Sequence, residues 1–176
     1  MDRRVFEHPV FSVEAFPVET RAGREEYVRL RMPDWVNVVA VTAKDELVLV
    51  RQHRWGTRRT TLEIPGGTVD GGEAPLEAAR RELVEETGYG RGTWYSLGSV
   101  HPNPAIQDNA TWLYAAVGVE PVAAPDLDPG EEIAVELAPA TALPRLLREE
   151  AITHALAVVT LQRFLLGWWR ESAPLA

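Results

Sequence analysis

The sequence contains no cysteine and, among its 18 basic residues, a single lysine, Lys44. Without cysteine, disulfides, thiolate zinc sites and a cysteine nucleophile are all excluded. The longest apolar runs fall well short of the roughly 20 residues that a membrane-spanning helix needs. The first ten residues, MDRRVFEHPV, hold no apolar stretch of the kind found in signal peptides. We therefore expect a soluble cytoplasmic protein that does not enter a membrane.

The sequence also has fewer basic than acidic residues. Acidic residues outnumber basic ones by 26 to 18, which gives a formal net charge of −8. This balance argues against binding to nucleic acid, which requires a basic surface. It still allows a small phosphorylated substrate where a metal cation mediates the contact. The length of 176 residues and the hydrophobic content of 45% favour one domain with a sizeable core and a small appendage.

The hydrophobic pattern predicts strands before and after one central helix. In residues 28–32, apolar and charged side chains alternate, as they do on a half-buried strand. The predicted strands are residues 10–19, 27–32, 35–42, 46–52, 60–64, 94–100, 111–119 and 133–137, and the predicted helices are residues 75–87, 142–149 and 153–170. This order indicates an α/β or α+β fold with a mixed sheet. We assign residues 1–35 to a small N-terminal antiparallel β unit and residues 36–176 to the main domain.

The central helix is predicted to begin near Pro75 and to end near Gly88. Its spacing places Glu82, Glu85 and Glu86 together on one side, apart from the apolar side. Like charges at this spacing cost about 0.2–0.5 kcal/mol per pair in an isolated helix. A divalent cation would reverse that penalty, because hard cations such as magnesium take oxygen ligands. For the helix alone, a solvated acidic surface is the alternative.

The loop before the helix bears on the choice between a metal site and a solvated acidic surface. Gly66, Gly67, Gly71 and Gly72 allow backbone conformations and close approaches that side chains would block. Glu73 adds a fourth carboxylate where the loop meets the helix. The G-K-[ST] ending of a P-loop is missing, so this loop is not a P-loop. A strand, a glycine loop and a helix with clustered carboxylates together favour a metal site over a bare surface.

The segment from Gly67 to Tyr89 resembles the Nudix box, GX5EX7REUXEEXGU. Five residues separate Gly67 from Glu73, and seven more lead to the run R-E-L-V-E-E-T-G-Y at residues 81–89. Every fixed letter is met, and the one departure is Tyr89, where the family prefers an aliphatic residue. The resemblance implies the Nudix fold, in which a mixed β-sheet lies between helices. It also implies hydrolysis of a nucleoside diphosphate linked to another group, dependent on Mg²⁺ or Mn²⁺, with room for one to three ions.

The resemblance also implies roles for single residues. It implies metal ligation by the Gly66 carbonyl, Glu82, Glu85 and Glu86. Glu73 would pair with Arg81 and orient the loop, or lie close to the metal cluster as a further ligand. The alternative for Arg81 is a surface partner of Glu77 or Glu85 at helical spacing.

Outside the box, residues 50–54 and 62–67 are similar to the V-x-Q-x-R and L-E-x-P-A-G segments of one branch of the family. This branch comprises the ADP-ribose and nucleoside diphosphate sugar pyrophosphatases. Residues 101–109 depart from the S-P-G sequence that is common for ADP-ribose and look more like the nucleotide-sugar hydrolases of the branch. The resemblance therefore implies hydrolysis of a nucleoside diphosphate sugar (ADP-ribose, GDP-mannose or similar) to a nucleoside monophosphate and a sugar phosphate.

We expect the substrate contacts to come from Arg51, Arg54, Glu63 and Asn109. Arginine supplies planar donors that suit a diphosphate, although a structural salt bridge explains Arg51 and Arg54 equally well. Glu63 would hydrogen-bond a base or ribose, with an ion pair as the alternative. Trp55 is a candidate for stacking on the base.

A general base would help to remove the proton of the attacking water. In this branch of the family it often comes from a flexible loop after the box, and here residues 126–133 form an acidic loop. Glu131 is our first choice and Glu132 the second, while a box glutamate such as Glu85 is a third possibility. The alternative for the loop residues is a solvated surface carboxylate.

Relatives in this branch are commonly homodimers whose N-terminal β unit contributes to the partner's site. Residues 1–35 fit that arrangement, so we expect a homodimer that binds a nucleotide sugar. Two other functions stay open: hydrolysis of nucleoside triphosphates, and a Nudix-like nucleotide sensor without catalysis. The retained box glutamates argue against the sensor, and the N-terminal extension argues against a compact triphosphate hydrolase.

Overall fold

The computed structural model describes residues 2–176. Its strands are β1 (Arg3–His8), β2 (Phe11–Thr20), β3 (Gly23–Arg31), β4 (Trp35–Thr42), β5 (Glu46–Arg54), β6 (Arg59–Glu63), β7 (Tyr89–Gly90), β8 (Thr93–Val100), β9 (Thr111–Pro121) and β10 (Ile133–Pro139). Its helices are α1 (Pro75–Thr87), α2 (Leu143–Arg148), which follows the 3-10 turn η1 (Ala140–Ala142), α3 (Ala155–Leu165) and α4 (Trp168–Glu171). The predicted α+β class and the central helix are thereby confirmed.

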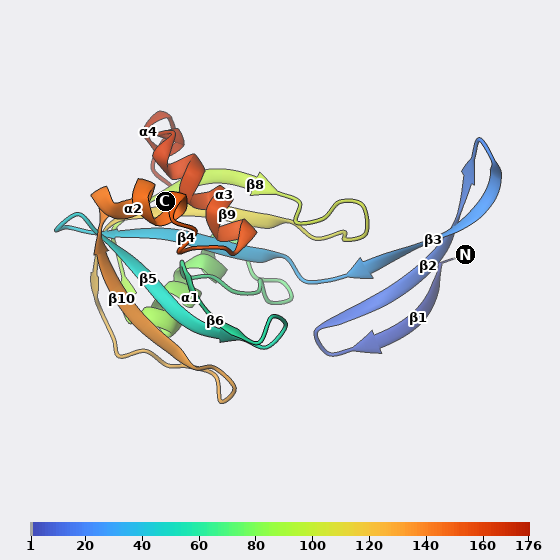
Figure 1. Cartoon of the computed structure of the whole chain (residues 1–176), viewed down its shortest axis with the longest axis horizontal. Coiled ribbons are helices and arrows are strands. Elements are labelled where there is room, and N and C mark those ends of the chain that lie inside the picture. The colour runs from blue at the N-terminus through green and yellow to red at the C-terminus, as the bar shows by residue number, and fades with distance from the viewer. Residues whose placement is uncertain (1) are drawn as a thin grey trace.

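The main sheet has the order β10-β5-β4-β9-β7, with β6 beside β5 and β8 beside β9. β4 and β9 run parallel, whereas β5 pairs antiparallel with β4, β6 and β10. The sheet is therefore mixed, as the order of elements predicts. Helix α1 covers one face, and α2 and α3 cover the other (Figure 1).

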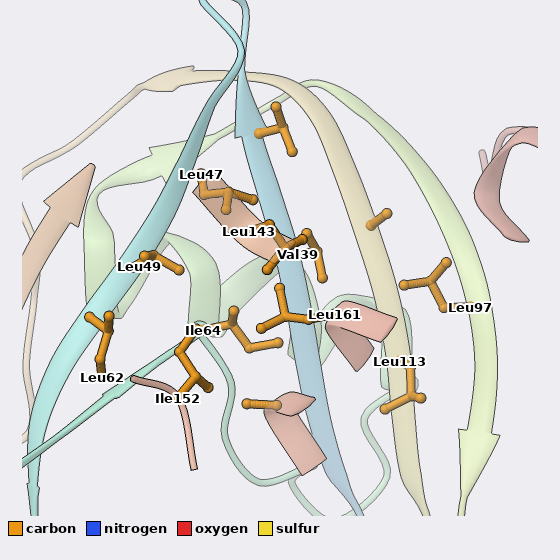
Figure 2. Packing of buried hydrophobic residues seen from close by; sticks show 13 residues of the cluster. Val39, Leu47, Leu49, Leu62, Ile64, Leu97, Leu113, Leu143, Ile152 and Leu161 are labelled. Atoms are coloured by element: carbon orange, nitrogen blue, oxygen red, sulfur yellow. The ribbon is translucent and has the colours of Figure 1, made fainter. Parts of the chain in front are cut away.

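The central strand β4 is buried on both faces. Successive side chains of a strand point to opposite faces, so Val39 packs with Leu143 of α2 and Leu161 of α3, as Figure 2 shows. Val36 and Val38 face the other way, toward the buried side of α1. Burial between two helical layers explains why this strand is almost continuously apolar in sequence.

The N-terminal unit is a separate sheet of β1, β2 and β3 that stands apart from the main body (Figure 1). Two details of this unit escaped prediction: no strand is predicted over residues 3–8, which form β1, and β3 begins at Gly23 rather than at residue 27. β1 is exposed along its whole length and lacks the alternation that marks a half-buried strand, so its pairing with β2 leaves no hydrophobic signal. The unit is joined to the body where Leu30 N–H donates to the Ile106 carbonyl (2.7 Å).

The last predicted helix is also corrected. Residues 153–170 form two helices, α3 and α4, because Gly167 adopts a left-handed φ of 81° that interrupts the α-helical backbone. Strand β7 escaped prediction because it is two residues long. None of the helices in residues 2–176 is long and apolar enough to cross a membrane.

Candidate active site

Helix α1 meets two different environments. It ends at Gly88, whose φ of 72° allows its N–H to donate to the Val84 carbonyl (2.8 Å). Ala79 and Leu83 are buried against the sheet. Burial of that side fixes the rotation of the helix and turns its carboxylates toward the preceding glycine loop.

The glycine loop is held by backbone bonds and approaches the helix closely. Val36 of β4 donates its N–H to the Gly67 carbonyl (2.8 Å), and Gly66 donates its N–H to Glu86 Oε2 (2.9 Å). A Cβ atom on Gly67 would lie 2.1 Å from Glu82 Oε1. The position therefore requires glycine if the Glu82 carboxylate is to stay where it is.

A cavity of about 670 Å³ lies between this loop, α1 and residues 126–131, and we call it the carboxylate cavity. Its acidic lining residues are Asp70, Glu82, Glu85, Glu86, Asp126, Asp128 and Glu131, and its basic lining residues are Arg54 and Arg81. Seven carboxyl groups thus face two guanidinium groups, an excess of five acidic groups. Such a lining attracts cations and repels a bare anion.

Arg81 binds several of the acidic side chains at once. Its Nη1 donates to Glu82 Oε1 (2.8 Å) and Glu85 Oε2 (2.9 Å). Its Nε and Nη2 donate to Glu73 (3.1 and 3.0 Å), and Nη2 also donates to the Thr68 carbonyl (2.9 Å). The expected pairing of Glu73 with Arg81 is therefore present. These bonds, those to Glu73 first, raise the pKa of the Arg81 guanidinium further above its usual range.

The buried carboxyl groups of Glu82 and Glu86 have too few positively charged neighbours to balance the effect of burial. Burial raises the pKa of Glu86 to about 8, against the hydrogen bond from Gly66 and with help from the charge of Glu82. Burial also raises the pKa of Glu82, against its bond from Arg81. Within residues 2–176, no three histidine, aspartate or glutamate side chains are already arranged to hold a metal ion. Arg81 bridges Glu82 and Glu85 instead.

Arg54 also lines the carboxylate cavity and is anchored by Glu63. Its Nε and Nη2 donate to the two carboxylate oxygens of Glu63 (2.9 Å each), and His154 Nδ1 lies 2.6 Å from Oε2. Burial would raise the pKa of Glu63, but bonds from Arg54, His154 and the Thr61 hydroxyl hold it well below its usual range. Glu63 therefore stays ionised and fixes the Arg54 guanidinium.

The predicted substrate residues do not all gather at one place. Arg54 lines the carboxylate cavity and also a second cavity of about 510 Å³, to whose wall Glu63 and Asn109 belong. Arg51 instead pairs with Glu136 of β10 (2.5 Å) and is not among the residues that line either cavity. The structure thus shows salt bridges for both arginines, and it brings one of them to the carboxylate cavity.

The two candidate bases are separated as well. Glu131 lines the carboxylate cavity, while Glu132 is exposed outside its lining. Trp55, the candidate for stacking, is 75% exposed and lines the second cavity. Its role stays a prediction.

Sequence reasoning missed several residues of the two cavities. Asp70, Asp126 and Asp128 lie in loops whose acidic composition was the only available signal. Trp35 lines both cavities, and His154 contacts a residue 91 positions away. No local sequence spacing indicates Trp35 or His154 as site residues, because only the fold brings them to the cavities.

The fold and the box together define a class. The NUDIX domain matches residues 32–160, so the chain belongs to the Nudix family. A crystal structure of an ADP compounds hydrolase shares the fold with a TM-score of 0.84, covering 97% of this chain and 92% of that chain at 27% sequence identity. This confirms the family resemblance and the mixed sheet between helices.

Three relatives place the chain within the family. It is 33% identical over 117 residues to the methanol dehydrogenase activator of Bacillus methanolicus, which covers 66% of this chain and 63% of that protein. It is 34% identical over 96 residues to the ADP-ribose pyrophosphatase of Bacillus subtilis (strain 168), covering 54% and 51%. It is 39% identical over 83 residues to the ADP compounds hydrolase NudE of Escherichia coli (strain K12), covering 46% and 45%. The chain thus matches less than two thirds of the length of each.

Proposed function

We propose that this protein hydrolyses the pyrophosphate bond of a nucleoside diphosphate sugar in a reaction that depends on Mg²⁺ or Mn²⁺. The observation that carries the proposal is the excess of acidic over basic groups in the carboxylate cavity, which the anchored Arg54 also lines. A diphosphate enters such a cavity only together with cations. The names of similar proteins, an ADP-ribose pyrophosphatase and two ADP compounds hydrolases, support this substrate class.

The residues that would hold the metal are the Gly66 carbonyl, Glu82, Glu85 and Glu86, with Glu73 nearby. All of them offer oxygen atoms, which suit Mg²⁺, and a bound cation would offset the burial that raises the pKa values of Glu82 and Glu86. When bound, one to three such ions would polarise the phosphate and lower the pKa of the attacking water. Arg81 would release Glu82 and Glu85 and keep its bonds to Glu73 and the Thr68 carbonyl.

The other residues of the cavity would bind and move protons. Arg54, held in one orientation by Glu63, would bind the diphosphate with planar donors. Glu131 would accept the proton of the attacking water, because it lies in the lining on a loop that faces α1. Glu132 is the second candidate and Glu85 the third. Arg81 would orient the box carboxylates as a positioning residue.

We also propose that residues 1–35 join two cytoplasmic copies of the chain into a homodimer. The sheet β1–β3 exposes apolar side chains, namely Val5 (52%), Phe6 (50%), Tyr27 (46%) and Val28 (52%). Light scattering should give a dimeric mass for the whole chain, and Val28→Asp should shift it toward the monomer. A monomeric wild-type protein would contradict the proposal.

The test of the reaction is a panel of ADP-ribose, GDP-mannose, other nucleotide sugars and nucleoside triphosphates, assayed with and without Mg²⁺. We expect nucleotide sugars to be hydrolysed, Glu86→Gln to abolish turnover and Mn²⁺ uptake, and Glu77→Gln to change neither. Glu77 is a fitting control because it lies on the same helix, exposed and paired with Arg80. Turnover of triphosphates alone would show the alternative hydrolase. Binding of nucleotide sugars without turnover would show the sensor.

A further inference from the structure

The first residues of β4 lie between two segments from different parts of the chain. On one side, β9 pairs in parallel with β4 from Trp35 onward, and Trp35 donates its N–H to the Ala110 carbonyl (3.0 Å). On the other side, the glycine loop runs antiparallel to β4, with a bridge between Trp35 and Thr68. The position of the glycine loop therefore depends on where β4 begins.

Asp34, the residue before β4, is bonded to both of these segments. Its carboxylate accepts the N–H of Ala110 at Oδ1 (2.8 Å) and the indole N–H of Trp112 at Oδ2 (2.9 Å). Its main-chain carbonyl accepts the N–H of Val69 in the glycine loop (2.9 Å). Asp34 is half-buried and lines neither cavity. A side chain outside the site thus fixes the backbone to which the glycine loop is bonded.

The anchored part of the loop carries two groups that bind Arg81. The Thr68 carbonyl, which lies one residue before the anchor, accepts a bond from Arg81 Nη2 (2.9 Å). On the other side of the anchor, Glu73 N–H donates to the Asp70 carbonyl (3.0 Å), and Asp70 N–H donates to Glu73 Oε2 (3.2 Å). The Glu73 carboxylate, held in this turn, is the second partner of Arg81. The place of Arg81 therefore depends on the loop segment that Asp34 anchors.

Arg81 stands between the loop and the box carboxylates. Its guanidinium also binds Glu82 and Glu85, two of the proposed metal ligands. A cation at that site competes with the guanidinium for these two carboxylates. Firm bonds to the Thr68 carbonyl and to Glu73 lower the cost of giving up Glu82 and Glu85, because Arg81 then keeps partners of its own.

From these contacts we infer that Asp34 is a positioning residue for the metal site. Its carboxylate fixes the glycine loop, so that Arg81 rests on the loop and leaves the box glutamates to a divalent cation. The inference rests on the proposed function for the presence of that cation. It predicts that a substitution outside both cavities weakens metal binding.

The test compares Asp34→Asn with the control Asp108→Asn. Asparagine keeps the shape of aspartate, but its NH2 group would face a donor, since both partners of the Asp34 carboxylate are donors. Asp108 holds the same linker through Arg31 (2.9 Å) and the Met32 N–H (3.4 Å), and within residues 2–176 its side chain has no hydrogen bond to the glycine loop. Amide exchange at Val69, followed by NMR in metal-free protein, should be faster in Asp34→Asn and unchanged in Asp108→Asn.

Mn²⁺ binding, measured by electron paramagnetic resonance, should weaken about 10-fold in Asp34→Asn, at the lower end of what loss of a supporting residue costs a metal site. Asp108→Asn should bind Mn²⁺ as the wild type does. Trp112→Phe and the double variant Asp34→Asn/Trp112→Phe should both bind about 3-fold more weakly than the wild type, because each keeps one of the two bonds to residue 34. In an Arg81→Gln background, Asp34→Asn should cause no further loss, since the residue through which it acts is gone.

Wild-type Mn²⁺ affinity and Val69 exchange in Asp34→Asn would overturn the inference. An equal loss with and without Arg81 would do the same, since it shows a merely structural effect. Should Asp34→Asn not fold, wild-type values for Trp112→Phe decide against the inference, and the 3-fold loss supports it. Mn²⁺ binding with the expected variant pattern, but no hydrolysis of any nucleotide sugar, would refute the proposed reaction and leave the role of Asp34 standing. A wild-type protein that binds no Mn²⁺ would refute both.

Discussion

Replacing Glu63 by glutamine removes the charge at the centre of the network that anchors Arg54. The side chain is 2% exposed and accepts bonds from the guanidinium and from the Thr61 hydroxyl (2.6 Å), with His154 at 2.6 Å. Glutamine has nearly the same shape but turns one acceptor into a donor. That donor would face groups that are themselves donors, so Arg54 would keep a charge with less compensation.

The expected loss of stability follows from the burial of the pair. Breaking a fully buried ion pair by removing one partner costs about 3–5 kcal/mol. The Arg54 side chain is 30% exposed, so water still solvates part of its charge. We therefore expect the free energy of unfolding to fall by about 2–3 kcal/mol. For a domain of this size, that corresponds to a fall in Tm of about 4–12 °C.

The loss should depend on pH with a definite sign. The pKa of Glu63 is lowered in the folded protein, so its charge stabilises the fold above the ordinary glutamate pKa of about 4.3. That contribution disappears as the pH falls from there toward the folded pKa. The difference in unfolding free energy between wild type and Glu63→Gln should therefore be large at neutral pH and shrink in acid.

Urea unfolding followed by tryptophan fluorescence measures this difference, with Glu136→Gln as the matched control. Glu136 also pairs with an arginine of β5, Arg51, but both side chains are more than 40% exposed. Exposed pairs contribute at most about 1 kcal/mol, so the control should change little. Equal losses for the two variants, or a loss for Glu63→Gln that persists unchanged in acid, would refute the reasoning.

Two further substitutions, each with a control variant, probe the carboxylate cavity. Gly67→Ala should weaken Mn²⁺ binding about 10–100-fold, because its Cβ would displace the Glu82 carboxylate. The control Gly71→Ala, which has open space around the added Cβ, should bind Mn²⁺ as the wild type does. Electron paramagnetic resonance of free Mn²⁺ measures the binding of both variants. Glu131→Gln should lower kcat about 100–10,000-fold with little change in KM, and Glu132→Gln should have a small effect, since it lies outside the lining. Near-wild-type turnover would remove Glu131 from the role of base.

The parts of the site that are readable from sequence are those built by local geometry. The glutamates of α1 share one helix and one turn spacing, and the glycine loop precedes them directly, so their proximity follows from residues 66–88 alone. The pairing of Glu73 with Arg81 follows in the same way. The Nudix box is itself a pattern of neighbouring residues, and the resemblance to it is what predicts the metal chemistry.

The parts that escaped prediction depend on contacts between distant segments. His154 reaches Glu63 because α3 packs on the face of the sheet where β6 ends, and neither residue carries a periodic signal for that contact. The same holds for Arg51 and Arg54, which lie on one strand three residues apart. Their odd spacing places them on opposite faces of the sheet, where Arg51 meets Glu136 of β10 and Arg54 meets Glu63 of β6.

The two cavities differ in the same way, one being built largely from neighbouring residues and the other from distant segments. The proposed metal ligands of the carboxylate cavity all come from residues 66–86, so a substitution elsewhere in the chain leaves this set of side chains unchanged. The second cavity is assembled from β4, β5, β6, the loop after β8 and the start of α3. A substitution in any of these elements can reshape the second cavity and leave the box carboxylates unchanged. Trp35 and Arg54 line both cavities, so we expect a substitution at either of these two residues to affect both.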